Sequence, residues 1–215
     1  MTMDLFEPDG SAQRESLGPG AFVLRRGALP DEAALLSAVH ELLARAPLRH
    51  MVTPGGRPMS VATSNCGALG WVSDLAGYRY VDRDPRSGLA WPSLPASWLR
   101  LAGRAAAEAG FEGFIPDACL INRYEPGARL SLHQDRDERD HTAPIVSVSL
   151  GLPAVFLFGG LARTDRATRV PLAHGDIVVW GGPARLRYHG VLPLQPGHHP
   201  LLGNYRINLT LRRAG

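Results

Sequence analysis

Hydrophobic residues recur every three or four positions in two segments of the chain and every second position in most of the others. The first spacing, in residues 30–46 and 96–110, predicts two amphipathic helices, and Gly110 marks the end of the second. The second spacing predicts short strands, separated by turns that are rich in Gly and Pro. The predicted strands are 21–29, 118–124, 129–135, 145–152, 154–159, 170–174, 176–182, 186–191 and 206–212.

Eight strands after two helices predict an α+β fold, in which a double-stranded β-helix (jelly roll) carries supporting helices on one face. We expect one domain over residues 1–215, with the jelly roll at about 115–213. The segment from about 51 to 95 is rich in Gly, Pro and aromatic residues, so the sequence predicts that it is mostly loop.

The last predicted strand, "RINLTLR", has an unusual polar face. Alternation places Ile207, Leu209 and Leu211 on one side, and Arg206, Asn208, Thr210 and Arg212 on the other. A solvated sheet face is the simple interpretation of such a row. A ligand site inside the roll is the alternative.

Composition and charge narrow the class of protein. With 215 residues, 45% of them hydrophobic and 20% charged, the chain can bury a core of its own. The net charge of +3 permits a polyanionic partner without requiring one. Every basic residue apart from histidine is an arginine, which we attribute to a GC-rich genome.

Location and membrane insertion can be judged from three further features. The two cysteines, Cys66 and Cys119, are too few for a disulfide framework, and they favour a reducing, cytoplasmic compartment. The N-terminus lacks the basic and apolar regions of a signal peptide. Residues 142–162 carry no formal charge, but the turn "GLP" within them predicts two buried strands and no membrane span.

Candidate metal ligands occur in the predicted strand "RLSLHQD". Alternation points His133 and Asp135 to the same face, and His189 in "RYHGV" is a third candidate on a later strand. Two histidines and one carboxylate form the facial triad that suits non-haem Fe(II). The rival motif, His174 and Asp176 in "AHGD", lies at a turn and is interpreted as structural.

A metal inside the roll changes the interpretation of the polar row on the last strand. Arg206, Asn208 and Arg212 then offer a clamp for a dicarboxylate. Asn122 and Tyr124 share a face of the strand 118–124 and can complete the cage.

The motifs "LSLHQDRDE", "YHG" and "RINLTLR" resemble the H-x-D…H and R-x-N-x-x-x-R signatures of the AlkB family of Fe(II)/2-oxoglutarate dioxygenases. The resemblance extends through "MVTPGG", "NCGALGW", "PDACLINRY", "APIVSVSLGLPAVF" and "HGDIVVWGG", and runs from "MDLF" to "RRAG". It implies three cofactors or co-substrates, namely Fe(II), 2-oxoglutarate and O2.

The resemblance also implies a role for each candidate residue. His133, Asp135 and His189 ligate Fe(II). The residues implied for 2-oxoglutarate are Arg206, Tyr124 and Asn208 at its distal carboxylate, and Asn122 and Arg212 near its metal-bound end. Those implied for the substrate are Trp71, which stacks on a flipped base against His133, Asp137 at the exocyclic amine of that base, and Tyr78 and Arg163 along the channel.

The implied reaction is the oxidative demethylation of 1-methyladenine and 3-methylcytosine in single- or double-stranded DNA, with RNA as a further candidate. The segment 51–95 becomes a nucleotide-recognition lid, and a cytoplasmic monomer is expected. From the residues alone, Trp71 and Tyr78 remain ordinary packing aromatics, and Arg163 and Asp137 remain solvated charges.

Two other functions stay open. One is a dioxygenase of the same fold that acts on a protein or a small molecule, and the other is a nucleic-acid-binding module without catalysis. Thr63 departs from the family pattern, which has methionine there. We expect this change to remove an apolar contact from the lid and to affect base preference.

Overall fold

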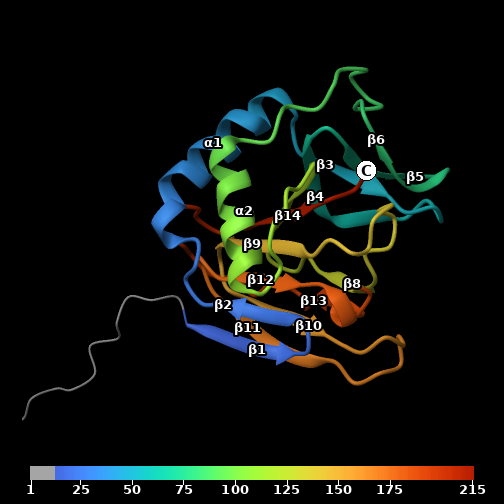
Figure 1. Ribbon diagram of the computed structural model, residues 1–215. Coiled ribbons are helices and arrows are strands. Elements are labelled where there is room, and N and C mark those ends of the chain that lie inside the picture. The colour runs from blue at the N-terminus through green and yellow to red at the C-terminus, as the bar shows by residue number, and fades with distance from the viewer. Residues whose placement is uncertain (1–12) are drawn as a thin grey trace, which may run out of the picture.

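The largest element of the protein is an antiparallel sheet of eight strands, as the computed structural model shows for residues 13–215 (Figure 1). In spatial order its strands are β1 (Arg14–Gly18), β2 (Ala21–Leu24), β12 (Ile177–Trp180), β9 (Ile145–Gly151), β14 (Arg206–Arg212), β7 (Ala118–Tyr124), β4 (Pro58–Gly67) and β3 (Arg49–Val52). The polar N-terminus that argues against a signal peptide, and the "MDLF" at which the resemblance begins, lie outside the described residues.

A second, smaller antiparallel sheet packs against one face of the first. Its strands, in order, are β11 (Thr168–Leu172), β10 (Ala154–Phe158), β13 (His189–Val191) and β8 (Leu130–His133). A buried cluster joins the two sheets, with Phe156 and Phe158 from the small sheet against Val178 and Trp180 from the large one. The predicted jelly roll is therefore confirmed, with an open end between the sheets.

Both predicted helices are present and cover the other face of the large sheet. They are α1 (Glu32–Arg45) and α2 (Ala96–Glu108), and Gly110 follows α2 with φ +90°, as a helix-ending glycine does. Two short 3-10 turns, η1 (Leu29–Asp31) and η2 (Gly182–Ala184), complete the helical elements in the described part of the chain. Leu35 of α1 and Trp98 of α2 are fully buried against the sheet in one apolar cluster.

The alternation predicted for the last strand is confirmed in β14. Ile207, Leu209 and Leu211 belong to the cluster under the helices. The four polar residues of the strand point to the opposite face, between the two sheets, where they are buried. A polar row at the middle of the large sheet, enclosed by the small sheet, is therefore no solvated face.

The prediction that residues 51–95 are mostly loop was wrong. This region contains much of β3, all of β4, and a separate hairpin formed by β5 (Gly70–Asp74) and β6 (Gly77–Val81). In β4 the small polar side chains are buried and hydrogen-bonded, as when the Ser64 hydroxyl donates to the carbonyl of Ala46, so the strand lacks clear hydrophobic alternation. Val72 and Trp91 join a small apolar cluster under the hairpin. β1, in the polar start of the chain, was also missed, because it is an edge strand that pairs only with β2.

The uncharged segment 142–162 forms the two predicted strands, β9 and β10, and no helix in the described residues is long and apolar enough to cross a membrane. Gly151 lies at the turn between them with φ +87°, and a side chain there would meet the carbonyl of Tyr205 at 2.5 Å. His174 lies in the turn before β12, as predicted, and its Nδ1 accepts a hydrogen bond from the amide of Gly151.

Candidate functional site

A cavity of about 320 Å³ opens between the two sheets, and every candidate site residue from the sequence lines it. These residues are His133, Asp135, His189, Asn122, Tyr124, Arg206, Asn208, Arg212, Trp71, Tyr78, Asp137 and Arg163. They come from both sheets, from the β5–β6 hairpin and from two loops. The fold thus brings together side chains that are far apart in the sequence.

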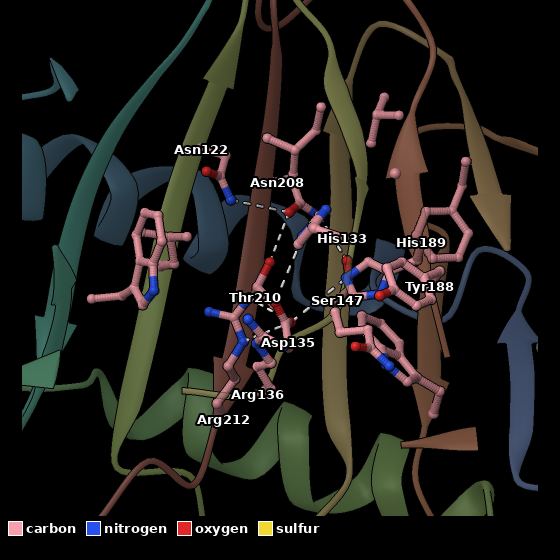
Figure 2. Close-up of a pocket in the computed structure, with 18 of the residues that line it drawn as sticks. Asn122, His133, Asp135, Arg136, Ser147, Tyr188, His189, Asn208, Thr210 and Arg212 are labelled. Atoms are coloured by element: carbon pink, nitrogen blue, oxygen red, sulfur yellow. Dashed lines mark hydrogen bonds and ion pairs between the residues drawn. The ribbon is translucent and has the colours of Figure 1, made fainter. Parts of the chain in front are cut away.

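The three candidate metal ligands form one cluster at the centre of the cavity (Figure 2). Their ligand atoms lie within 4.8 Å of one another, and Asp135 Oδ1 is 3.6 Å from His133 Nε2. Asp135 Oδ2 is 3.7 Å from His189 Nε2. The two histidines are brought together by strand pairing, because His133 at the end of β8 and His189 at the start of β13 are direct partners.

Each histidine is held in the tautomer that a metal needs. His133 Nδ1 lies 2.8 Å from the carbonyl of Ser131, and His189 Nδ1 lies 3.0 Å from that of Arg187. An Nδ1–H that donates to a carbonyl leaves the Nε2 lone pair free. Both Nε2 atoms face Asp135, so two imidazole nitrogens and one carboxylate oxygen converge on the same point.

The charge state of the cluster also suits a cation. Burial alone would raise the pKa of Asp135, but the Arg212 guanidinium and the two histidines outweigh it and hold that pKa well below its usual range. Arg212 Nη2 and Nε donate to Asp135 Oδ2 at 2.7 and 3.0 Å. Burial, and then the neighbouring His133, lower the pKa of His189 to about 4, so its ring is neutral at pH 7.

This donor set fits Fe(II). Two imidazoles and one carboxylate on one side of the centre form the facial triad of non-haem iron proteins, which leaves the opposite positions for other ligands. The cavity provides that open side.

Arg206 is the second notable feature of the cavity, because it is a buried cation without an anionic partner among residues 13–215. Only 2% of the residue is exposed, and Nη2 donates to Ser149 Oγ at 2.8 Å. The other two nitrogens, Nε and Nη1, have no hydrogen-bond partner in the part of the chain that the structure describes. Burial lowers the pKa of Arg206 to about 10, so the group is still charged at neutral pH. An unpaired buried guanidinium fits the carboxylate of a small ligand.

Tyr124 is the direct partner of Arg206 across the β7–β14 pair. Burial raises the pKa of Tyr124 to about 12, which keeps the phenol protonated and able to donate. A phenol and a guanidinium side by side, both in a closed end of the cavity, fit the distal carboxylate of 2-oxoglutarate.

The amides of Asn208 and Asn122 lie between Arg206 and the metal ligands. Asn208 Nδ2 donates to Ser147 Oγ at 2.8 Å and to the carbonyl of Val148 at 3.1 Å. Its Oδ1 accepts from Thr210 at 2.8 Å and from Asn122 Nδ2 at 3.4 Å (Figure 2). Asn208 therefore forms part of the cavity wall, and its hydrogen bonds fix the side chains of Ser147, Thr210 and Asn122.

At the mouth of the cavity, two aromatic rings and an acid form one group. Trp71 and Tyr78 of the β5–β6 hairpin stack with ring centroids 5.5 Å apart and planes 13° apart. Trp71 Nε1 donates to Asp137 Oδ2 at 2.8 Å, and Arg163 lies exposed on the loop after β10. The ring on which Trp71 stacks in this structure is Tyr78. The base sandwich with His133 stays a prediction.

Thr63 lies away from the mouth, in the middle of β4. It is 1% exposed, pairs with Asn122 of β7, and its hydroxyl approaches the carbonyl of Arg49 at 3.5 Å. It does not line the cavity. Its effect on base preference therefore stays a prediction.

A charged network behind Asp135 was missed by the sequence reasoning. Tyr80 donates to Glu138 Oε1 at 2.7 Å, and Arg185 donates to the backbone carbonyl of Asp135 at 2.7 Å. Glu138 forms ion pairs with both Arg185 and Arg212. The only signal in the sequence was the charge run "RDERD", which is usually exposed.

Comparisons with known proteins agree with this geometry. Residues 21–212 match the model of the 2OG-Fe(II) oxygenase superfamily. The chain is 57% identical, over 99% of its length and 98% of the other protein, to the alpha-ketoglutarate-dependent dioxygenase AlkB of Salmonella typhimurium. It is 35% identical to the human nucleic acid dioxygenase ALKBH1 over 69% of this chain and 37% of that protein. The solved structure of OsALKBH1 superposes with a TM-score of 0.83 at 28% identity, covering 94% of this chain and all of that one.

Proposed function

Because the chain belongs to the 2OG-Fe(II) oxygenase superfamily, we propose that it removes methyl groups from N-alkylated bases of nucleic acids as an Fe(II)- and 2-oxoglutarate-dependent dioxygenase. The substrates are 1-methyladenine and 3-methylcytosine in single- or double-stranded DNA, and RNA is a further substrate. The products are the repaired base, formaldehyde, succinate and CO2. The observation that carries the proposal is the cavity itself, which joins a metal triad, an unpaired arginine and an aromatic mouth.

His133, Asp135 and His189 would hold the iron. Arg206 and Tyr124, with Asn208 ordering the wall between them and the metal, would hold the distal carboxylate of 2-oxoglutarate. Asn122 and Arg212 would contact the end at which the keto acid binds the metal, and the hydrogen bonds from Arg212 to Asp135 support this for Arg212. When bound, iron, 2-oxoglutarate and O2 supply the oxidant that hydroxylates the N-methyl group.

The remaining chemistry needs little from the protein beyond positioning. A hydroxymethyl group on a ring nitrogen is a hemiaminal, which breaks down to formaldehyde and the unmodified base. Catalysis therefore depends on holding the methyl group over the open side of the triad. The side chain of His133 is 35% exposed, so water reaches the centre through the mouth, and a base held in the mouth would exclude it.

Base recognition rests on Trp71, Tyr78 and Asp137. A methyl group on the Watson–Crick edge is reached only when the base leaves the stack, which costs least for a base whose pairing is already broken. Trp71 would stack on the flipped base, and Asp137 would accept a hydrogen bond from its exocyclic amine. Arg163 on the rim would contact the phosphate backbone, so binding should weaken as salt increases.

Residues 51–95 would act as the nucleotide-recognition lid. The β5–β6 hairpin within them carries both aromatic residues of the mouth, which supports this role. A cytoplasmic monomer is part of the same proposal, since one chain provides every candidate residue and both cysteines are free thiols.

The test is to load the protein with Fe(II) without oxygen, add 2-oxoglutarate, air and a single-stranded oligonucleotide with one 3-methylcytosine, and follow the oligonucleotide mass. We expect the mass to fall by one methylene group. The His133→Ala variant should be inactive. The His40→Ala variant should retain activity, because His40 is exposed on α1, on the far side of the large sheet. Succinate formation without a change in oligonucleotide mass would indicate another substrate, such as a protein or a small molecule. No succinate and no demethylation would refute the enzyme proposal.

A further inference from the structure

Tyr80 of β6 does not line the cavity, yet it is linked to a metal ligand through side-chain contacts. Its hydroxyl donates to Glu138 Oε1 at 2.7 Å, and the same Oε1 lies 3.3 Å from Arg212 Nε. Arg212 in turn donates twice to Asp135 Oδ2. The contacts Tyr80–Glu138–Arg212–Asp135 are therefore continuous, and Arg212 Nη1 also donates directly to the Tyr80 hydroxyl at 3.4 Å.

The hydroxyl of Tyr80 is the main group that orients Glu138, because the other contacts of this carboxylate are ion pairs without good hydrogen-bond geometry. Its Oε2 is 3.1 Å from Arg185 Nη2 but has no hydrogen bond of good geometry. Within the described residues, the hydroxyl of Tyr80 is the one hydrogen-bond donor to this carboxylate. Burial raises the pKa of the Tyr80 phenol well above its usual value, so the phenol remains a donor.

Because Glu138 and Arg212 are buried, the orientation of the Glu138 carboxylate affects the position of Arg212. Glu138 and Arg212 are each 6% exposed, and in such surroundings charge–charge contacts are strong and depend on direction. If Glu138 turned, Arg212 would be drawn between two carboxylates in a different geometry. The carboxylate of Asp135 would then no longer be held by two donors that converge on its Oδ2.

Tyr80 also connects this network to the mouth of the cavity. It pairs directly with Trp71 across the β5–β6 hairpin. Trp71 donates to Asp137, and Tyr80 donates to the next residue, Glu138. The hairpin is thus fixed at two consecutive positions to the loop after β8, the loop that carries Asp135.

We propose that Tyr80 is a positioning residue, whose hydroxyl orients Glu138 and, through Arg212, fixes the carboxylate of Asp135. The hairpin that carries the aromatic mouth thereby also sets the geometry of a metal ligand. This inference rests on the proposed function in one respect, the assignment of Asp135 as a ligand.

The first test measures metal affinity without any nucleic acid. The dissociation constant of Mn(II), with 2-oxoglutarate present, is measured by electron paramagnetic resonance for the wild type, Tyr80→Phe and Tyr205→Phe. Loss of a partner behind a metal ligand typically weakens metal binding 10- to 100-fold, so we expect about a 10-fold loss for Tyr80→Phe. Tyr205→Phe is the matched control, because Tyr205 packs beside the helix cluster and its hydroxyl makes no hydrogen bond within the described residues. It should bind like the wild type.

A double-mutant cycle tests the route. If Tyr80 acts through Glu138, then Tyr80→Phe combined with Glu138→Gln should bind Mn(II) no more weakly than Glu138→Gln alone. Additive losses would overturn the proposed route. Melting temperatures of the same variants show whether the fold as a whole is weakened. If the loss of Mn(II) affinity across the variants only follows the loss of melting temperature, the inference is overturned.

A second measurement is the amount of succinate formed per base demethylated. A poorly held Asp135 should raise this ratio in Tyr80→Phe and leave it unchanged in Tyr205→Phe. If Tyr80→Phe has the affinity and the ratio of the wild type, the inference is wrong. If the wild type itself binds no Mn(II), the metal site fails, and the proposed function fails with it.

Discussion

Replacing Arg206 by methionine should make the protein more stable and at the same time unable to bind 2-oxoglutarate. The guanidinium is fully buried, and two of its three nitrogens have no hydrogen-bond partner within the described residues. Methionine keeps much of the length and the volume of the side chain but removes the charge. The substitution should therefore raise the free energy of unfolding of the ligand-free protein. In the complex with 2-oxoglutarate, it removes the main contact to the distal carboxylate of the ligand.

The expected magnitude follows from the pKa of Arg206. Burial lowers it from 12.5 to about 10, and at 1.36 kcal/mol per pKa unit this corresponds to about 3 kcal/mol against the charged form in the folded state. A basic group whose folded pKa lies below its unfolded value destabilises the fold at neutral pH, so removing the charge stabilises it. The lost hydrogen bond to Ser149 offsets about 1–2 kcal/mol. A net gain of about 1–2 kcal/mol should raise the melting temperature by about 2–8 °C.

The assay is thermal unfolding at neutral pH, with and without 2-oxoglutarate in the presence of Mn(II). The wild type should gain about 2.7 kcal/mol at a ligand concentration 100 times the dissociation constant, and Arg206→Met should gain nothing at that concentration. Arg185→Met is the matched control, because Arg185 is equally buried but fully paired, with Asp135, Ala143 and Glu138. It should lose about 3–5 kcal/mol. The reasoning is refuted if Arg206→Met melts below the wild type, or if its stability still rises with 2-oxoglutarate.

Three further predictions concern the metal ligands and the mouth. Asp135→Asn should abolish Mn(II) binding and also lower the free energy of unfolding by about 3–5 kcal/mol, because it breaks the shorter of the two buried ion pairs of Arg212 and leaves only the one with Glu138; unchanged thermal unfolding would contradict this. Gly190→Ala should weaken Mn(II) binding and lower the melting temperature together, because the added Cβ would lie 2.6 Å from the carbonyl of Leu130 and force β13 away from β8. A crystal structure of the variant in which β8 and β13 keep their positions would contradict this. Trp71→Leu should raise the KM for a methylated oligonucleotide about 10-fold through the loss of stacking, with Mn(II) affinity unchanged; an unchanged KM in steady-state assays would exclude the stacking role.

The polar row of β14 could be predicted because it depends on strand alternation: in a strand, two residues separated by one position share a face, so "RINLTLR" indicates which side chains point together. For "HQD" the same argument named the right pair, but the strand predicted over 129–135 ends at His133, and Asp135 reaches the centre from the loop after β8. His189 could be proposed as a third ligand by its residue type. The pairing that places it opposite His133 became known only from the structure.

The hairpin and the network behind Asp135 could not be predicted in this way. β4 is buried through small hydrogen-bonded side chains rather than through apolar alternation, so its sequence lacks the usual signal of a strand. In the run "RDERD", Asp137 lies at the mouth while the adjacent Glu138 is buried between two arginines. That difference depends on Arg185 and Arg212, which are remote in sequence, and on Tyr80. The roles of Trp71, Tyr78 and Arg163 came from family resemblance alone.

The pairing of His133 with His189 has a consequence for how the protein folds. The two residues belong to strands that are distant along the chain, so this contact forms at a high entropic cost and is expected late in folding. A slip of one residue between β8 and β13 would turn one histidine to the outside, and the donor set would not exist. A metal ion would therefore stabilise only molecules in which these strands are correctly aligned. Metal binding would thus favour the correct alignment of β8 and β13 independently of any reaction.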